Sequence, residues 1–92
     1  MKTIYNTYKT MVAKVPTEVL AEVDLSFAIS DELDAMIRAK GLTKKQFAEE
    51  IGKHPSEVTK WLSGQHNFTL RTISMLSAYF GKPLVVPANY VR

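Results

Sequence analysis

The chain has 92 residues, which suit one domain with a modest core and leave little room for a buried catalytic cleft. It contains no cysteine, which excludes disulfides, zinc ribbons and thiol nucleophiles and fits a reducing cytoplasm. No apolar run approaches the roughly 18 residues of a membrane-spanning helix, and the N-terminus lacks the apolar core of a signal peptide. We therefore expect a cytoplasmic protein that does not associate with a membrane.

The charges are unevenly distributed along the chain. Of nine acids, six lie between residues 18 and 34: Glu18, Glu22, Asp24, Asp31, Glu32 and Asp34. From Thr43 onward the bases outnumber the acids: Lys44, Lys45, Lys53, Lys60, Arg71, Lys82 and Arg92 against Glu49, Glu50 and Glu57. A polyanion-binding face needs such a local basic excess, so we expect it in the C-terminal half.

Residues 1–16 form an N-terminal arm or helix, two alternatives that the pattern leaves open. Apolar residues recur there at helical spacing, but Ile4 and Tyr5 equally suit the start of an extended arm. Pro16 ends the segment, because the residue before a proline is biased away from helical angles. The segment either docks a partner chain or folds back on its own core.

Residues 17–40 are predicted to be helical, with Thr17 as the N-cap and Gly41 as the stop. Either one helix covers the range or a break falls near Asp24 or Ser30, where Ser30 could act as an internal N-cap. A helical stripe is expected to pack on Phe47, Ile51 and Trp61. Its members are Leu25, Ala28, Ile29, Leu33, Met36 and Ile37.

Two short helices joined by a tight turn are predicted between Leu42 and Gly64. Thr43 and Gln46 have the spacing of a capping box, and Gly52 can leave the first helix through the left-handed region. Pro55 suits the first position of the second helix, which Gly64 ends. The inward faces carry Phe47, Ala48 and Ile51 in the first helix and Val58, Trp61 and Leu62 in the second.

Thr69 is expected to cap a further helix that Gly81 stops, with Leu70, Ile73, Leu76 and Phe80 facing inward. Phe68 before it should enter the core. Arg71 lies near the positive end of this helix, which hints at an external anion. The tail Pro83–Pro87 is a β-branched run between prolines. It is an edge strand that pairs with a second copy, or it folds over its own helices.

The spacing of Ala48, Gly52 and Val58 resembles the helix-turn-helix of the Xre family, to which the lambda-type repressors belong. This resemblance implies an all-α, lambda repressor-like bundle of about five helices with a short extended C-terminal segment. The domains would be an arm or helix at 1–16, a DNA-binding domain at 17–81 and a tail at 82–92. It also implies that the second helix enters the major groove of double-stranded DNA.

The outward face of that helix supplies the candidate base-reading residues: Ser56, Glu57, Thr59 and Lys60. Lys60 can donate to guanine O6 and N7, and Glu57 can accept from cytosine N4, whereas phosphates repel a carboxylate. The alternative for each is a merely solvated position. The candidate phosphate-binding residues are Thr43, Lys44, Lys53, His54, Gln65, His66 and Asn67. No metal, cofactor or catalytic site is expected, since His54 and His66 are the only histidines.

A narrower resemblance is to the HigA-type antitoxins within the Xre family, over residues 18 to 81. It rests on the segments Glu22–Ile29, Thr43–Lys45, Lys60–Gly64 and His66–Leu70. It implies a repressor of its own operon that also neutralises a ribonuclease toxin. Two functions therefore remain open: a sequence-specific repressor, expected to be a homodimer on a palindromic site, and an antitoxin whose main role is to mask a toxin.

Overall fold

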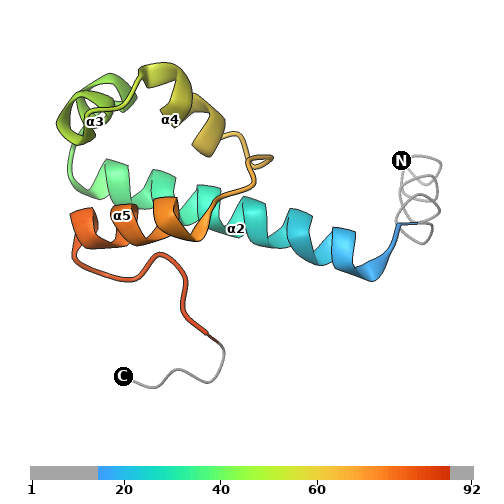
Figure 1. The fold of residues 1–92 in the computed structure, drawn as a ribbon. Helices are drawn as coiled ribbons and strands as arrows, with labels where there is room; N and C mark the ends of the chain where they lie inside the picture. Colours follow the sequence, from blue (N-terminus) through green and yellow to red (C-terminus); the bar gives the residue numbers. More distant parts are fainter. Residues whose placement is uncertain (1–14, 88–92) are drawn as a thin grey trace.

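The computed structural model describes residues 15–87, so the predictions for residues 1–14 and 88–92 lie outside the described part. Within it are four helices: α2 (Thr17–Ala39), α3 (Lys44–Ile51), α4 (Pro55–Trp61) and α5 (Leu70–Phe80). Residues 15–87 contain no strand, which confirms the all-α class, although the expected five helices are four here. The C-terminal half of α2 carries α3, α4 and α5, and its N-terminal half extends beyond them (Figure 1).

Helix α2 is continuous, so no break occurs near Asp24 or Ser30. Its N-cap position is Pro16, which makes no side-chain cap, and Thr17 is already the first helical residue. The prediction that Thr17 caps the helix is therefore wrong. The carbonyl of Pro16 instead accepts from the N–H groups of Val19 and Leu20, at 3.0 and 3.2 Å. Because Pro16 has a fixed φ, it starts the helix one residue earlier than the hydroxyl pattern indicated.

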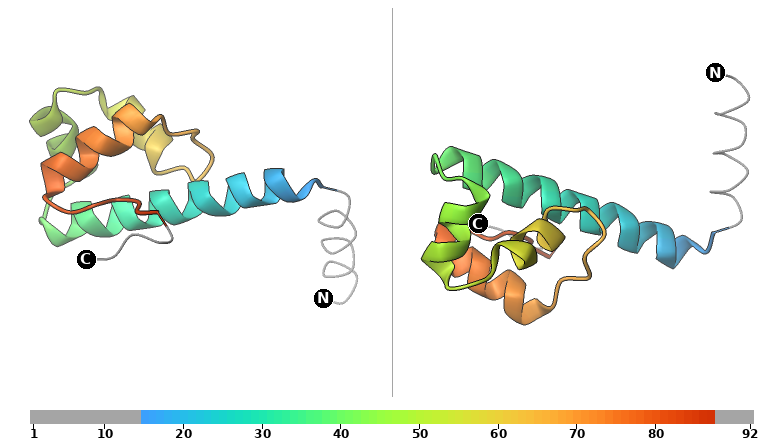
Figure 2. Two further views of the ribbon diagram at one scale, coloured as in Figure 1. Left: turned by 60° about the horizontal axis from the view of Figure 1, so that its bottom comes forward. Right: turned by 90° about the horizontal axis from the view of Figure 1, so that it is seen from above.

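The core lies between the C-terminal half of α2 and the three shorter helices. Its buried apolar residues are Ile29, Leu33, Met36, Ile37, Phe47, Ala48, Val58, Trp61, Leu76 and Leu84. The predicted α2 stripe is confirmed from Ile29 to Ile37, but Leu25 and Ala28 are exposed. Helices α3, α4 and α5 lie along the C-terminal half of α2 (Figure 2). Leu25 and Ala28 lie outside the face of α2 that the bundle buries.

The caps of α3 and the start of α4 are as the sequence predicted. Thr43 Oγ1 accepts from the Gln46 N–H at 3.1 Å, and Gln46 Oε1 accepts from the Thr43 N–H at 2.9 Å. Gly52 is left-handed, with φ 71°, and Pro55 begins α4. Helix α4 ends at Trp61 rather than at Gly64, so the prediction that Gly64 ends it is wrong. Gly64, with φ 83°, lies in the following turn.

Helix α5 is capped by Thr69, whose Oγ1 accepts from the Thr72 N–H at 3.1 Å, and its last residue, Phe80, is followed by the C-cap Gly81 with φ 75°. Leu70 is 78% exposed, so its predicted inward orientation is wrong. At this end of α5 it is Phe68, in the preceding loop, that packs against the core.

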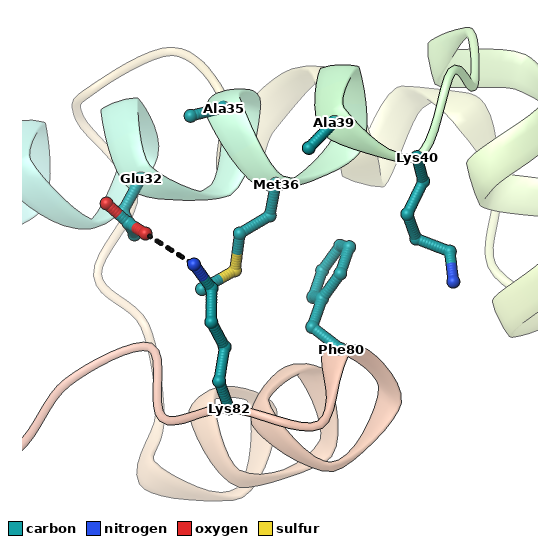
Figure 3. A pocket seen from close by; sticks show the side chains of 7 residues that line it. All are labelled: Glu32, Ala35, Met36, Ala39, Lys40, Phe80 and Lys82. Atoms are coloured by element: carbon teal, nitrogen blue, oxygen red, sulfur yellow. Dashed lines mark ion pairs between the residues drawn. The ribbon is translucent and has the colours of Figure 1, made fainter.

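The described tail folds over its own helices, which was one of the two alternatives. Leu84 is buried in the core, and its N–H donates to Ser77 Oγ at 2.9 Å. A hollow of about 370 Å³ lies beside the tail, between the C-terminal ends of α2 and α5 (Figure 3). Lys82 Nζ pairs there with Glu32 Oε2 at 3.6 Å. The tail therefore ties α5 to α2.

Candidate nucleic-acid interface

Helices α3 and α4 pack closely across a tight turn. The Lys53 N–H donates to the Ala48 carbonyl at 2.9 Å, and the Gly52 N–H donates to the Glu49 carbonyl at 3.3 Å. These bonds satisfy the last carbonyls of α3 while the chain reverses. Ala48 and Val58 are both fully buried. The structure therefore confirms the roles predicted for three residues: Ala48 at the close contact, Gly52 in the turn and Val58 in the core.

Ser30 of α2 holds the C-terminal end of α4. Its Oγ donates to the Trp61 carbonyl at 2.6 Å and accepts from the Gly64 N–H at 3.2 Å. Ser30 is 3% exposed, so both backbone groups depend on this hydroxyl rather than on water. Sequence reasoning missed this role. The available signal was its helical spacing with Leu33 and Ile37, which puts a serine on the buried stripe.

The turn after α4 also packs against α2 through Phe27. A Cβ at position 64 would lie 2.3 Å from Phe27 Cε1, so only glycine fits beneath the ring. The positive φ of Gly64 is a second reason for glycine here. Helix α4 is thus joined to α3 at its start and to α2 at its end.

Three of the four predicted base-reading residues are exposed on α4: Ser56, Thr59 and Lys60. Val58 and Trp61 face the core on the opposite side, as predicted. Thr59 Oγ1 donates to the Pro55 carbonyl at 3.1 Å. In the described part of the chain the ion pairs are Arg38–Asp34 and Lys82–Glu32, so Lys60 pairs with no described carboxylate.

Glu57, the fourth predicted base-reading residue, is half-buried and has a structural partner. Its Oε1 accepts from the His54 N–H at 3.3 Å, as the third residue of a helix does in a capping box. This bond places the carboxylate near the start of α4. It accounts for an acid at position 57 without a cytosine, which makes Glu57 the weakest of the four candidates.

The predicted phosphate-binding residues fall into three groups. Thr43 and Lys44 are exposed at the start of α3, Lys53 and His54 are exposed in the turn before α4, and the range 65–67 follows α4. The second and third groups flank α4, whereas the first lies at the far end of α3. His66 is half-buried, with its ring edge-on to Phe68 at 4.8 Å between centroids, so it also serves packing.

The charges of the described chain are unevenly distributed along the sequence. Between residues 15 and 37 the chain has six acids and no lysine or arginine.

Glu50 of α3 accepts a hydrogen bond from the Tyr79 hydroxyl of α5, and Lys40 Nζ lies 4.9 Å from the centre of the Tyr79 ring. That hydrogen bond, with burial and the carboxylate charge, raises the pKa of Tyr79 to about 12. This link between α3 and α5 was also not anticipated from sequence.

Two helices joined through a left-handed glycine, the second buried on one face and presenting polar and basic residues on the other, define a DNA-binding helix-turn-helix domain. The chain belongs to the helix-turn-helix family HTH_3, which matches residues 33–86, more than half of its length. The match covers α3, α4, α5 and the core-forming end of α2 and supports the Xre-like assignment. No curated protein matches the sequence. In residues 15–87 no helix is long and apolar enough to cross a bilayer.

Proposed function

We propose that this DNA-binding protein is a transcriptional repressor that recognises one sequence in double-stranded DNA and controls its own operon. The observation that carries the proposal is the outward face of α4. Ser56, Thr59 and Lys60 are exposed there, while Val58 and Trp61 on the opposite face are buried in the core. Rigid anchoring matters because bidentate contacts to base edges require fixed geometry. The proposal includes no catalytic step and no cofactor.

In this proposal Lys60 binds guanine, and Ser56 and Thr59 contact neighbouring base edges or phosphates. The phosphate-binding residues set the register of α4: Thr43, Lys44, Lys53, His54, Gln65, His66 and Asn67. Helix α4 has only seven residues and spans few base pairs. A homodimer on a palindromic site would double the contacts, and two half-sites are what selective binding by such small modules needs.

The test is fluorescence anisotropy on a labelled duplex from the upstream region of the gene and on a scrambled duplex, across a salt series. Lys60→Ala should abolish the preference between the duplexes. Lys53→Ala should weaken binding to both alike and lower the salt slope by about 1, because it removes one phosphate contact. Lys82→Ala is the charge-matched control, since Lys82 lies beside α2 and pairs with Glu32.

Two results would contradict the proposal. One is the absence of any preference for the upstream duplex by the unaltered protein at moderate salt. The other is an equal loss in Lys60→Ala and Lys82→Ala, which would mean that net charge alone drives binding.

A second candidate function is that of an antitoxin that binds and neutralises a ribonuclease toxin. It is supported by the exposed apolar side chains on the N-terminal half of α2, among them Val19, Val23 and Phe27, which DNA binding through α4 does not use. Co-expression with the product of a neighbouring reading frame would test it. A stoichiometric complex that abolishes ribonuclease activity supports this function, and continued cleavage in the presence of the protein contradicts it.

A further inference from the structure

The N-terminal half of α2 carries an apolar line of Val19, Val23 and Phe27, which the turn after α4 meets only at its Phe27 end. Val19, Val23 and Phe27 are four residues apart and therefore lie on one face of the helix. Their exposed fractions are 43%, 44% and 46%. Single exposed apolar residues are ordinary, but an aligned series along a helix that projects from its bundle is typical of an interaction surface (Figure 1).

This line borders a groove where α2 passes the turn after α4. The groove has a volume of about 310 Å³ and is lined by Glu22, Val23, Ser26, Phe27, Gly64 and Gln65. One wall is the close contact between Phe27 and Gly64. The groove is therefore a preformed feature of two elements that the core holds together.

Acidic side chains flank the line on both sides. With 3.6 residues per turn, Glu18 and Glu22 lie on one flank, Asp24 lies on the other, and Asp31 continues the line one turn after Phe27. The two ion pairs among residues 15–87 use other acids, Asp34 and Glu32. No lysine or arginine occurs between residues 15 and 37 to neutralise the flanks. A positively charged occupant is therefore electrostatically favoured at this surface.

We propose that the apolar line of Val19, Val23 and Phe27, together with the groove that it borders, binds a basic amphipathic helix of a partner protein. The apolar line supplies anchor positions for the apolar face of that helix, and the acidic flanks pair with lysine or arginine at its edges. A second copy of this chain is disfavoured, because it would bring the same acids against each other. The inference rests on the groove and its charges; it uses the same surface as the antitoxin candidate but requires neither proposed function.

The experiment uses the full-length ¹⁵N-labelled protein and a synthetic amphipathic peptide of leucine and lysine as the probe. Binding should shift the backbone amide signals of residues 19–27 and of Gly64 and Gln65. A peptide with glutamate in place of lysine should not bind. Val23→Lys should weaken binding by at least about tenfold, a loss of roughly 1.4 kcal/mol.

Leu25→Lys is the matched control. Leu25 is 53% exposed on the same helix but lies on its opposite face, so the variant introduces the same charge away from the groove. Its affinity for the lysine peptide should stay within about twofold of the unaltered protein. Both substituted side chains are exposed, so both variants should fold, which circular dichroism verifies. DNA binding of both variants, measured separately, reports on the repressor function alone.

Four results would overturn the inference. Equal weakening in the two variants would mean a general charge effect, and binding of the glutamate peptide would remove the charge argument. Self-association that Val23→Lys abolishes would make a second copy the occupant. Nuclear Overhauser contacts from residues 1–14 to Val23 in the free protein would make the N-terminal segment the occupant.

Discussion

Two small residues, Ser30 and Gly64, determine where α4 ends relative to α2. Ser30 serves two backbone groups that are 31 and 34 residues away in sequence. Gly64 leaves the space that the Phe27 ring occupies. A larger residue at either position would displace the end of the helix that presents Lys60. Ser30 and Gly64 therefore affect the proposed DNA-binding site indirectly, by fixing the position of α4.

Gly64→Ala should destabilise the fold more than Gly41→Ala does. Both glycines have positive φ, 83° and 72°, so both variants bear the cost of a left-handed alanine, roughly 1–2 kcal/mol. Only at position 64 does the new Cβ meet another side chain, because nothing lies within 4 Å at Gly41. We expect a further loss of about 1–3 kcal/mol for Gly64→Ala. Urea denaturation measures both, and equal losses would show that Phe27 yields at no cost.

At the scale of the elements, α2 has two halves with different roles. Its C-terminal half supplies Ile29, Leu33, Met36 and Ile37 to the core, while its N-terminal half presents Val19, Val23 and Phe27 outward. Helix α4 is too short to be stable alone and depends on its neighbours. Because α2 holds α4 through Ser30, the long helix connects the proposed partner groove to the DNA-binding element.

Ser30→Ala tests that connection. The substitution leaves the Trp61 carbonyl and the Gly64 N–H without their buried partner, and an unsatisfied buried group costs about 1–3 kcal/mol. We expect a loss of that size in the free energy of unfolding. Ser74→Ala, on the exposed side of α5, is the control and should change it by less than about 0.5 kcal/mol. Matching values for the two variants would refute the role of Ser30.

At the scale of the whole molecule, α5 and α3 are joined through an aromatic cluster. The Phe47 ring packs edge-on to Tyr79 and parallel to Phe80, with centroids 5.6 and 5.7 Å apart. The hydrogen bond from Tyr79 to Glu50 adds a polar link at the surface. Glu50, one of the three acids after residue 42, is therefore directed toward α5.

The Tyr79 link should make stability depend on alkaline pH. The pKa of Tyr79 rises from 10.0 to about 12 in the fold, mainly because its hydroxyl donates to Glu50. The stabilisation is therefore complete below pH 10 and is lost as the pH rises toward 12. The difference in unfolding free energy between the unaltered protein and Tyr79→Phe should be constant below pH 10 and shrink above it. Urea denaturation at several pH values measures this difference, and one that does not change with pH would contradict the assignment.

Local chemistry made much of this fold predictable from sequence. Caps at Thr43 and Thr69, the turn at Gly52 and the stop at Gly81 involve bonds within a few residues, so the residue types suffice to place them. The spacing of Ala48, Gly52 and Val58 likewise indicated the family and hence the candidate base-reading helix. The roles of the site residues on DNA stay predictions.

Only the tertiary structure decided which parts of the helices are covered. The apolar pattern of α2 continues past the point where the bundle ends, so the exposure of Leu25 could not be deduced from spacing. The exposure of Leu70 could not be deduced from spacing either, because Phe68 packs against the core at that end of α5 instead. Ser30 and Glu50 acquire their partners from residues about thirty positions away. Such contacts depend on how the helices pack, and helical periodicity describes one helix at a time.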